Sequence, residues 1–61
     1  MFLVVETVKE ENLLLNLDKI LNFVELKNGS CRVFLDDGCY FDLNLSFFTL
    51  CELLPIANTK S

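Results

Sequence analysis

The three cysteines are the residues of this 61-residue chain with the most distinctive chemistry. Thiolates bind zinc, form disulfides and act as nucleophiles, but each role needs a partner at a suitable spacing. Cys31, Cys39 and Cys51 are eight and twelve residues apart, no Cys-x-x-Cys pair occurs, and the chain has no histidine. Histidine is the usual base for a cysteine nucleophile and the commonest nitrogen ligand of zinc. The sequence therefore predicts three free, buried thiols, with no metal, no cofactor and no catalytic residue.

Three carboxylates lie close together in the sequence, a pattern that can indicate a calcium loop or a catalytic acid pair. Asp36-Asp37-Gly38 has the composition of a turn, and Asp42 is better interpreted as the partner of Arg32. The only two glycines both lie in predicted turns, so the sequence contains no glycine-rich phosphate loop. We therefore predict that the protein is not an enzyme.

The first predicted hairpin is centred on Asn28-Gly29, which lies between two runs rich in β-forming residues. Asn-Gly is the strongest signal for a two-residue hairpin turn, because both residues tolerate positive φ. Such a turn places Glu25 opposite Arg32 and Phe23 opposite Phe34, and both are favourable cross-strand pairs.

The second predicted hairpin has two possible registers. A two-residue loop at Asp37-Gly38 would place Arg32 opposite Leu43, whereas a three-residue loop with Gly38 in a left-handed conformation places Arg32 opposite Asp42. We prefer the three-residue loop because it keeps apolar residues on one face and pairs the opposite charges.

These registers predict a three-stranded meander with two different faces. The core face is apolar and carries Val24, Leu26, Cys31, Val33, Leu35, Cys39, Phe41 and Leu43. The other face carries an aromatic strip beside a charged row, namely Phe23, Phe34 and Tyr40 beside Glu25, Arg32 and Asp42.

Two further strands are expected upstream, at Phe2–Lys9 and Leu13–Leu17, followed by a bend at Asp18-Lys19. Their apolar residues do not alternate with polar ones, which predicts burial on both faces. The complete fold is thus expected to be mainly β: a small antiparallel meander of about five strands with one short C-terminal helix.

The helix is expected after Ser46, a favourable N-cap residue. Its apolar stripe has helical spacing and consists of Phe47, Leu50, Cys51 and Leu54. Phe48 and Leu53 lie off this stripe, and Pro55 ends the helix. We expect residues 1–55 to form a single compact domain, and residues 56–61 to form a loose tail.

Composition predicts that the protein binds other proteins, including a second copy of itself. Hydrophobic residues make up 52% of the chain and the mean hydropathy is +0.44, although a chain this short has little interior in which to bury them. A homodimer interface is the natural place for the surplus. The residues expected to form this interface are Phe23, Phe34, Tyr40, Phe48 and Leu53.

Charge and hydropathy argue against nucleic acid and membrane as partners. The net charge is −4, whereas phosphate contacts need clustered Lys or Arg. The longest apolar runs, Met1–Val5 and Leu13–Leu15, are far shorter than the ~18 residues of a spanning helix. Without a recognisable export signal, the expected location is the cytoplasm.

The spacing of the two hairpins and the capped helix, over Ile20–Leu54, resembles the β-meander of LytTR-type DNA-binding domains. The start of the chain, Met1-Phe2-Leu3-Val4, is similar to that of the dimeric CsrA regulators, which bind RNA. These resemblances imply a nucleic-acid-binding regulatory module, although the basic residues used by both families are missing here.

The leading hypothesis is therefore a small non-catalytic protein-binding regulator or inhibitor. Phages and mobile elements encode chains of this kind, which block a host enzyme or defence complex. The alternatives are a nucleic-acid-binding or transcription-regulatory module and a structural subunit of a larger assembly.

Overall fold

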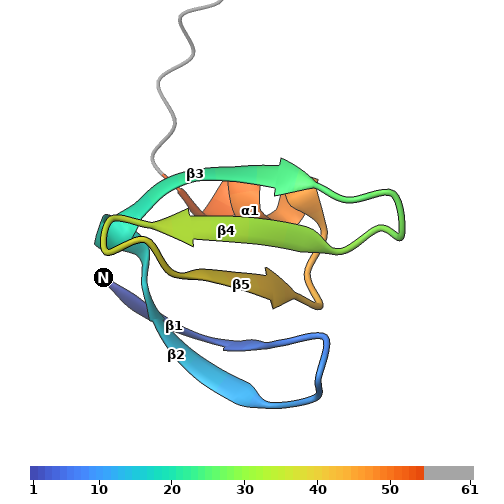
Figure 1. The fold of residues 1–61 in the computed structure, drawn as a ribbon, viewed down its shortest axis with the longest axis horizontal. Helices are drawn as coiled ribbons and strands as arrows, with labels where there is room; N and C mark the ends of the chain where they lie inside the picture. Colours follow the sequence, from blue (N-terminus) through green and yellow to red (C-terminus); the bar gives the residue numbers. More distant parts are fainter. Residues whose placement is uncertain (55–61) are drawn as a thin grey trace, which may run out of the picture.

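The computed structural model describes residues 1–54 and is mainly β (Figure 1). In chain order the elements are β1 (Phe2–Glu6), β2 (Asn12–Asn16), the 3-10 helix η1 (Leu17–Lys19), β3 (Ile20–Glu25), β4 (Cys31–Leu35), β5 (Tyr40–Leu43) and α1 (Phe47–Leu53). The prediction of about five antiparallel strands and one short C-terminal helix is confirmed. The predicted helix end at Pro55 and the predicted tail at 56–61 lie outside the described residues.

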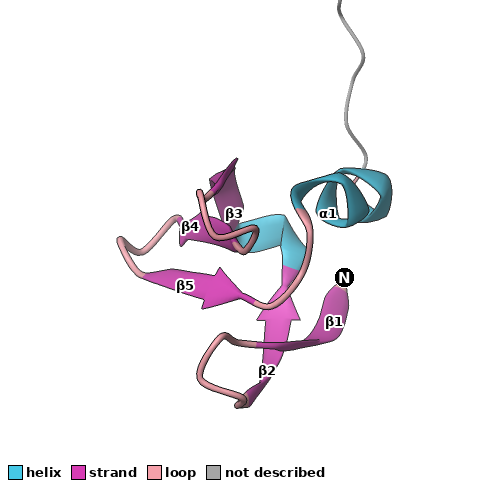
Figure 2. Ribbon diagram, turned by 90° about the vertical axis from the view of Figure 1, so that its right-hand side faces the viewer, coloured by secondary structure: helices cyan, strands magenta, loops and turns pink. Residues whose placement is uncertain are grey.

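The five strands form two sheets instead of one continuous meander. β1 pairs with β2, and β3, β4 and β5 form the second sheet in that order. The sheets meet where Thr7 bridges Leu43, flanked by hydrogen bonds from Val8 N to Asp42 O (3.0 Å) and from Asn44 N to Glu6 O (2.8 Å). α1 packs on the inner side of the three-stranded sheet (Figure 2). No other element of residues 1–54 covers the outer side of this sheet.

The second hairpin has the predicted three-residue loop. Leu35 N donates to Cys39 O at 2.8 Å, Gly38 N donates to Leu35 O at 3.1 Å, and Gly38 has a φ of +90°. Arg32 is therefore opposite Asp42, and the preferred register is confirmed.

The first hairpin differs from its prediction by one residue. Leu26 N donates to Ser30 O at 2.9 Å and Gly29 N donates to Leu26 O at 3.0 Å, so the loop has three residues. Gly29 has a φ of +90°, whereas Asn28 does not have the positive φ that a two-residue Asn-Gly turn requires. Instead, the Asn28 side chain accepts hydrogen bonds from the backbone and hydroxyl of Ser30, at 2.9 and 2.6 Å.

This shift exchanges the two faces of β3, because side chains alternate along a strand. Phe23 pairs with Val33 and Val24 pairs with Arg32, so the predicted pairs Phe23–Phe34 and Glu25–Arg32 are wrong. Phe23 lies on the inner face, where its ring centroid is 5.2 Å from that of Phe47 on α1. Val24 moves to the outer face and is 43% exposed.

The core is small and draws on both sheets and the helix. Its buried apolar residues are Val5, Leu15, Leu17, Cys31, Val33, Leu43 and Leu50. In the N-terminal hairpin, burial alternates: Val5 and Leu15 face the core, while Phe2, Val4 and Leu14 are each more than 60% exposed. The predicted burial on both faces of these strands is wrong, because no helix or strand in the described part of the chain covers the outer face of the β1–β2 pair.

The C-terminal helix follows its prediction. Ser46 Oγ caps it by accepting a hydrogen bond from Thr49 N at 3.0 Å. Leu50 is fully buried and Phe47 is packed against the core, whereas Phe48 is 70% exposed. The periodicity of the apolar residues therefore identified the buried side of α1 correctly.

Replacing Gly38 tests the second hairpin. A Cβ at this position meets no atom within 4 Å, so the penalty arises from the positive φ alone. Gly38→Val is expected to lower the free energy of unfolding by about 1–2 kcal/mol, since a β-branched residue resists this conformation. Urea denaturation at a fixed protein concentration measures the change. Gly38→Asn is the control, and its free energy of unfolding should fall less because Asn tolerates the left-handed region. A Gly38→Val variant as stable as the parent would contradict the assigned loop.

Candidate interaction surface

The predicted interface residues lie on two sides of the three-stranded sheet. Phe34 and Tyr40 are neighbours on its outer face, paired across β4 and β5 with ring centroids 5.9 Å apart. Phe48 and Leu53 belong to α1, which lies against the inner face of this sheet (Figure 2). The predicted aromatic strip of three residues is wrong for Phe23, which faces the core. A single flat contact cannot include all five residues.

The outer face carries a compact group of interacting side chains that we call the outer patch: Arg32, Phe34, Tyr40 and Asp42. The Arg32 guanidinium carbon lies 4.6 Å from the centre of the Tyr40 ring. Arg32 Nε and Nη2 donate to the two carboxylate oxygens of Asp42 at 2.6 and 3.0 Å. Because the guanidinium is held by both partners, the patch presents a fixed arrangement of ring, cation and carboxylate.

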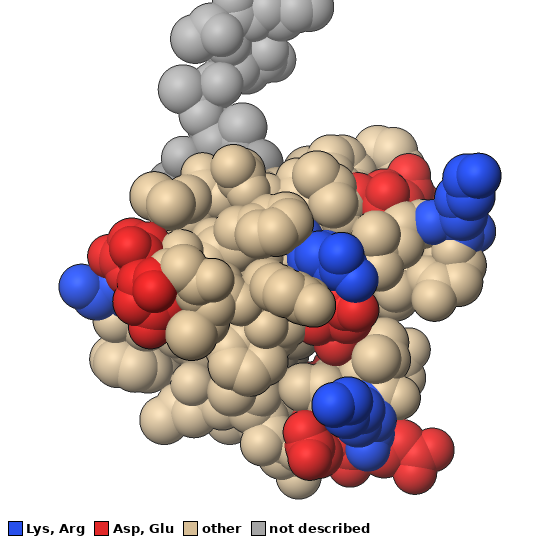
Figure 3. Space-filling view, viewed as in Figure 1, with Lys and Arg blue, Asp and Glu red and all other residues tan. Residues whose placement is uncertain are grey.

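Apolar side chains continue around the outer patch. Val24 pairs directly with Arg32, and Leu21 lines a shallow hollow together with Phe34. Val24 is 43%, Leu21 68% and Tyr40 54% exposed. Figure 3, which views this side, shows one basic and one acidic group side by side near the middle with uncharged surface around them, while the other charged groups gather at the ends.

The ion pair at the centre of the outer patch alters the acidity of both partners. The hydrogen bond from Arg32 lowers the pKa of Asp42 below its ordinary value, and the same bond raises the pKa of Arg32. Their side chains are 25% and 34% exposed, respectively, so solvent screens the pair only in part. The positive charge of Arg32 is therefore paired with a carboxylate of the same chain, so the centre of the outer patch has no net charge.

The second aromatic group joins the inner face of β3 to the exposed side of α1. Phe47 packs against Phe23 and against Phe48, with centroid distances of 5.2 and 5.5 Å. Phe48 is 70% exposed and Leu53 is 39% exposed. These two residues thus offer a second apolar surface that is separated from the outer patch by the thickness of the sheet.

The cysteines occupy three different environments and are free thiols in the structure. Cys31 is buried, and this burial raises the pKa of its thiol. Cys51 is half-buried on α1. Cys39 is exposed, so the prediction that it lies on the core face is wrong: it precedes β5 in the turn, where its N–H donates to Asp37 Oδ1 at 3.0 Å. Across residues 1–54, no three His, Cys, Asp or Glu side chains converge in a way that could hold a metal ion.

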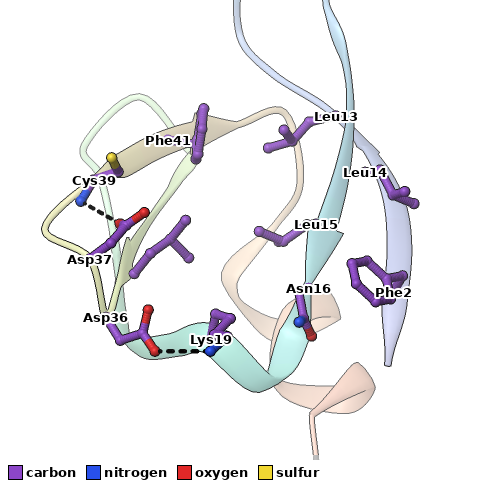
Figure 4. Close-up of a pocket in the computed structure, with 11 residues that line it drawn as sticks. Phe2, Leu13, Leu14, Leu15, Asn16, Lys19, Asp36, Asp37, Cys39 and Phe41 are labelled. Atoms are coloured by element: carbon purple, nitrogen blue, oxygen red, sulfur yellow. Dashed lines mark hydrogen bonds and ion pairs between the residues drawn. The ribbon is translucent and has the colours of Figure 1, made fainter.

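A groove lies between β2 and the turn that joins β4 to β5, and the sequence alone did not indicate it. It has a volume of about 530 Å³. Figure 4 shows Leu13 and Leu15 pointing across it toward Phe41, with Lys19 and Asp36 at one end. The Lys19 Nζ is 3.6 Å from Asp36 Oδ2. The one feature of the sequence that could have suggested an open strand edge here is the run Asn12–Asn16, whose sequence NLLLN contains neither a charged residue nor proline.

Comparison with known proteins gave no match to a protein-family model, a curated protein or a solved structure. Within residues 1–54, the only α-helix is far too short to cross a membrane. The interpretation of the surfaces therefore depends on their own geometry and charge.

The lowered pKa of Asp42 leads us to predict how the free energy of unfolding changes at low pH. A depressed pKa in the folded state means that the ion pair contributes its full stability above the ordinary Asp pKa of about 3.9, and that this contribution is lost as the pH falls through the folded value. The free energy of unfolding of the parent should thus fall more steeply with acidification below about pH 5 than that of Asp42→Asn. Urea denaturation across this pH range measures the difference.

The Asp42 carboxyl carbon can be followed directly by NMR titration. Arg32→Gln should return the pKa of Asp42 toward its ordinary value, because the main hydrogen-bond donor is gone. An ordinary Asp42 pKa in the parent protein would show that the ion pair does not persist in solution.

Proposed function

We propose that the protein is a small non-catalytic protein-binding regulator or inhibitor, and that it pairs with a second copy through the outer patch. The observation that supports this most directly is the outer patch itself, where Tyr40 is 54% exposed yet fixed against Arg32 and Phe34. Tyr and Arg are the residue types that dominate binding energy at protein interfaces. Side chains that are already fixed lose less conformational entropy on binding.

The charges of the patch suit contact with an identical surface. Arg32 and Asp42 lie side by side on neighbouring strands, so the patch contains both a cation and an anion. In a two-fold contact each surface meets itself, and Arg32 of one copy can lie beside Asp42 of the other. The net charge of −4 opposes this association only weakly, because salt screens charges beyond about 8–10 Å.

The apolar area is of the right order for a dimer. Each copy contributes Leu21, Val24, Phe34 and Tyr40, and complete burial of one large apolar side chain is worth roughly 1.5–3 kcal/mol. These side chains are already partly covered in the monomer, so each contributes a fraction of that value. The sum over two copies is comparable to the association cost of about 4–15 kcal/mol. We therefore expect a dimer that dissociates on dilution.

The surfaces that remain free in such a dimer are compatible with the proposed regulatory role. The exposed side of α1 lies across the sheet from the outer patch, and none of the four outer-patch residues lines the groove beside β2. A paired molecule can therefore still bind a larger host or cellular protein. Inhibition would then consist of covering a surface of that target.

The dimer is tested by sedimentation equilibrium at concentrations up to about 100 μM, where a complex of micromolar affinity is well populated. Phe34→Glu should yield a folded monomer, because it places a charge inside the buried patch. Phe48→Glu is the matched control: it makes the same change on the opposite side of the sheet and should leave the dimer intact.

Three results would contradict the proposed contact in different ways. A parent that stays folded and monomeric throughout the range would rule out the dimer. A dimer that dissociates with Phe48→Glu and persists with Phe34→Glu would move the contact to α1. If the dimer persists with both substitutions, the contact lies on neither of these two surfaces.

A further inference from the structure

We propose that the groove beside β2 binds an extended segment of a partner protein, which adds to the free edge of β2 as a further strand. The bound segment would alternate apolar residues with others and carry a Lys or Arg near Asp37. This inference deepens the proposed function, on which it rests, by naming the chemical class of partner and the site that receives it.

The hydrogen bonding of the N-terminal hairpin leaves the outer edge of β2 open. Thr7 N donates to Glu11 O and Leu17 N donates to Met1 O, both at 2.8 Å. Hydrogen-bonded pairs alternate with non-bonded pairs in an antiparallel ladder, so the odd-numbered residues of β2 bond to β1. The N–H and C=O of Leu14 therefore point away from β1, and no strand within residues 1–54 pairs with that side of β2.

The edge of β2 lacks the features that usually prevent such pairing. Edge strands are commonly protected by charged side chains, by proline or by a bulge. β2 has the sequence NLLLN and a regular register with β1 over its whole length. By contrast, the other sheet has two edge strands: β3 has an irregularity between Ile20 and Asn22 and ends in Glu25, and β5 is bridged through Leu43 to Thr7.

The open edge borders the apolar groove. Leu14 lines the groove, and Figure 4 shows its side chain pointing away from Phe41. The hydrogen-bonding pattern of the hairpin directs the backbone N–H and C=O of Leu14 away from β1. Leu13 and Leu15 supply the wall on the same side, and Leu35 and Phe41 supply the opposite wall. A strand added to this edge directs every second side chain into the groove, because side chains alternate with a period of two.

The charge at one end of the groove favours a basic residue. Asp36 already has a cationic partner in Lys19, at 3.6 Å. Asp37 has no ion pair with any residue in 1–54, and it accepts a hydrogen bond from Cys39 N at 3.0 Å. This backbone hydrogen bond lowers the pKa of Asp37, so its carboxylate is charged at neutral pH. A Lys or Arg of the bound strand would be the missing partner.

The same charges disfavour a second copy of this chain in the groove. A two-fold pairing of β2 with itself is antiparallel and, centred on Leu14, sets Asn16 opposite Asn12 of the second copy. The acidic turn at Glu10-Glu11 of that copy would then lie at the Asn16 end, beside Asp36-Asp37. Like charges at this distance oppose the contact, whereas a foreign basic segment is attracted.

The experiment selects a random-peptide library, displayed on phage, against the immobilised full chain. Selected peptides are then synthesised with a fluorescent label, and their Kd is measured by fluorescence anisotropy. The expected peptides share alternating apolar residues and a Lys or Arg. Leu14→Pro should raise their Kd by about tenfold or more, because it removes the edge N–H without touching a bond to β1.

The matched control is Val4→Pro, the same change on the opposite edge of the same hairpin. Val4 and Leu14 form a pair in the ladder, so the Val4 N–H points away from β2 and its loss should leave the Kd unchanged within about twofold. Asp37→Asn keeps the hydrogen-bond acceptor for Cys39 and removes the charge, so it should weaken binding and reduce its dependence on salt.

A measurement without any substitution covers the case in which Leu14→Pro fails to fold. Hydrogen exchange of the Leu14 amide in the parent should slow when a selected peptide is added, while exchange of the Val4 amide should not. Three results would overturn the proposal: a library that yields no binder, peptides that bind Leu14→Pro as tightly as Val4→Pro, or an unprotected Leu14 amide in the complex.

The proposal of a peptide-binding groove and the proposal of a dimer can be tested independently. Peptide binding by the monomeric Phe34→Glu variant would support the groove whatever the outer patch does. Loss of peptide binding from a protein that still dimerises would reject the groove and leave the proposed dimer standing.

Discussion

Gly29 and Gly38 each end a three-residue hairpin loop at a φ of +90°, and the registers that they set determine which side chains become core. A strand presents alternate residues to opposite faces, so a register one residue different would exchange every inward side chain for its neighbour. With the observed registers, Val33 and Cys31 point to the inner face of the sheet and are completely buried. Arg32 and Asp42 are directed to the other face, where both stay partly exposed as an ion pair. The outer patch and the core are therefore two consequences of the same pair of turns.

The second governing constraint is size. A domain of this length has too few residues to cover both faces of two sheets. Within residues 1–54, α1 covers only the inner side of the three-stranded sheet. Large apolar side chains consequently remain exposed in three places: around the outer patch, on the far side of α1 and on the outer face of β1–β2. On the face that carries the outer patch, the charged groups other than the Arg32–Asp42 pair lie toward the ends of the elements (Figure 3).

The two proposed binding surfaces differ in their physical basis. The outer patch offers side chains fixed by mutual contacts, and its paired charges make it complementary to itself. The groove beside β2 offers unpaired backbone groups and an apolar cleft with an unmatched carboxylate at Asp37. Backbone hydrogen bonding gives affinity with little dependence on sequence, so specificity at the groove comes from the alternate side chains and from the charge. A dimer formed at the patch would present two such grooves, and a partner with two suitable segments would gain in effective concentration.

Local sequence determined those features that depend on residues close together in the chain. Gly38 identified the loop that pairs Arg32 with Asp42, Ser46 marked the start of α1, and the helical spacing of Phe47, Leu50 and Leu54 identified its packed side. Each of these follows from a steric or hydrogen-bonding preference that acts within a few residues, and each was predicted correctly. Composition likewise predicted that apolar side chains would remain exposed.

The tertiary structure decided whatever depended on long-range contacts. Asn28-Gly29 is compatible with a two-residue and a three-residue loop, and the three-residue loop gives a register in which Phe23 packs against Phe47 of α1, a contact the sequence could not reveal. The runs in β1 and β2 are apolar on both sides, and Phe2 and Leu14 stay exposed because no element of residues 1–54 covers their face of the hairpin. The groove arises because β2 and the β4–β5 turn, distant in sequence, meet without pairing. No local sequence pattern predicts the groove, because the groove depends on how the two sheets pack against each other.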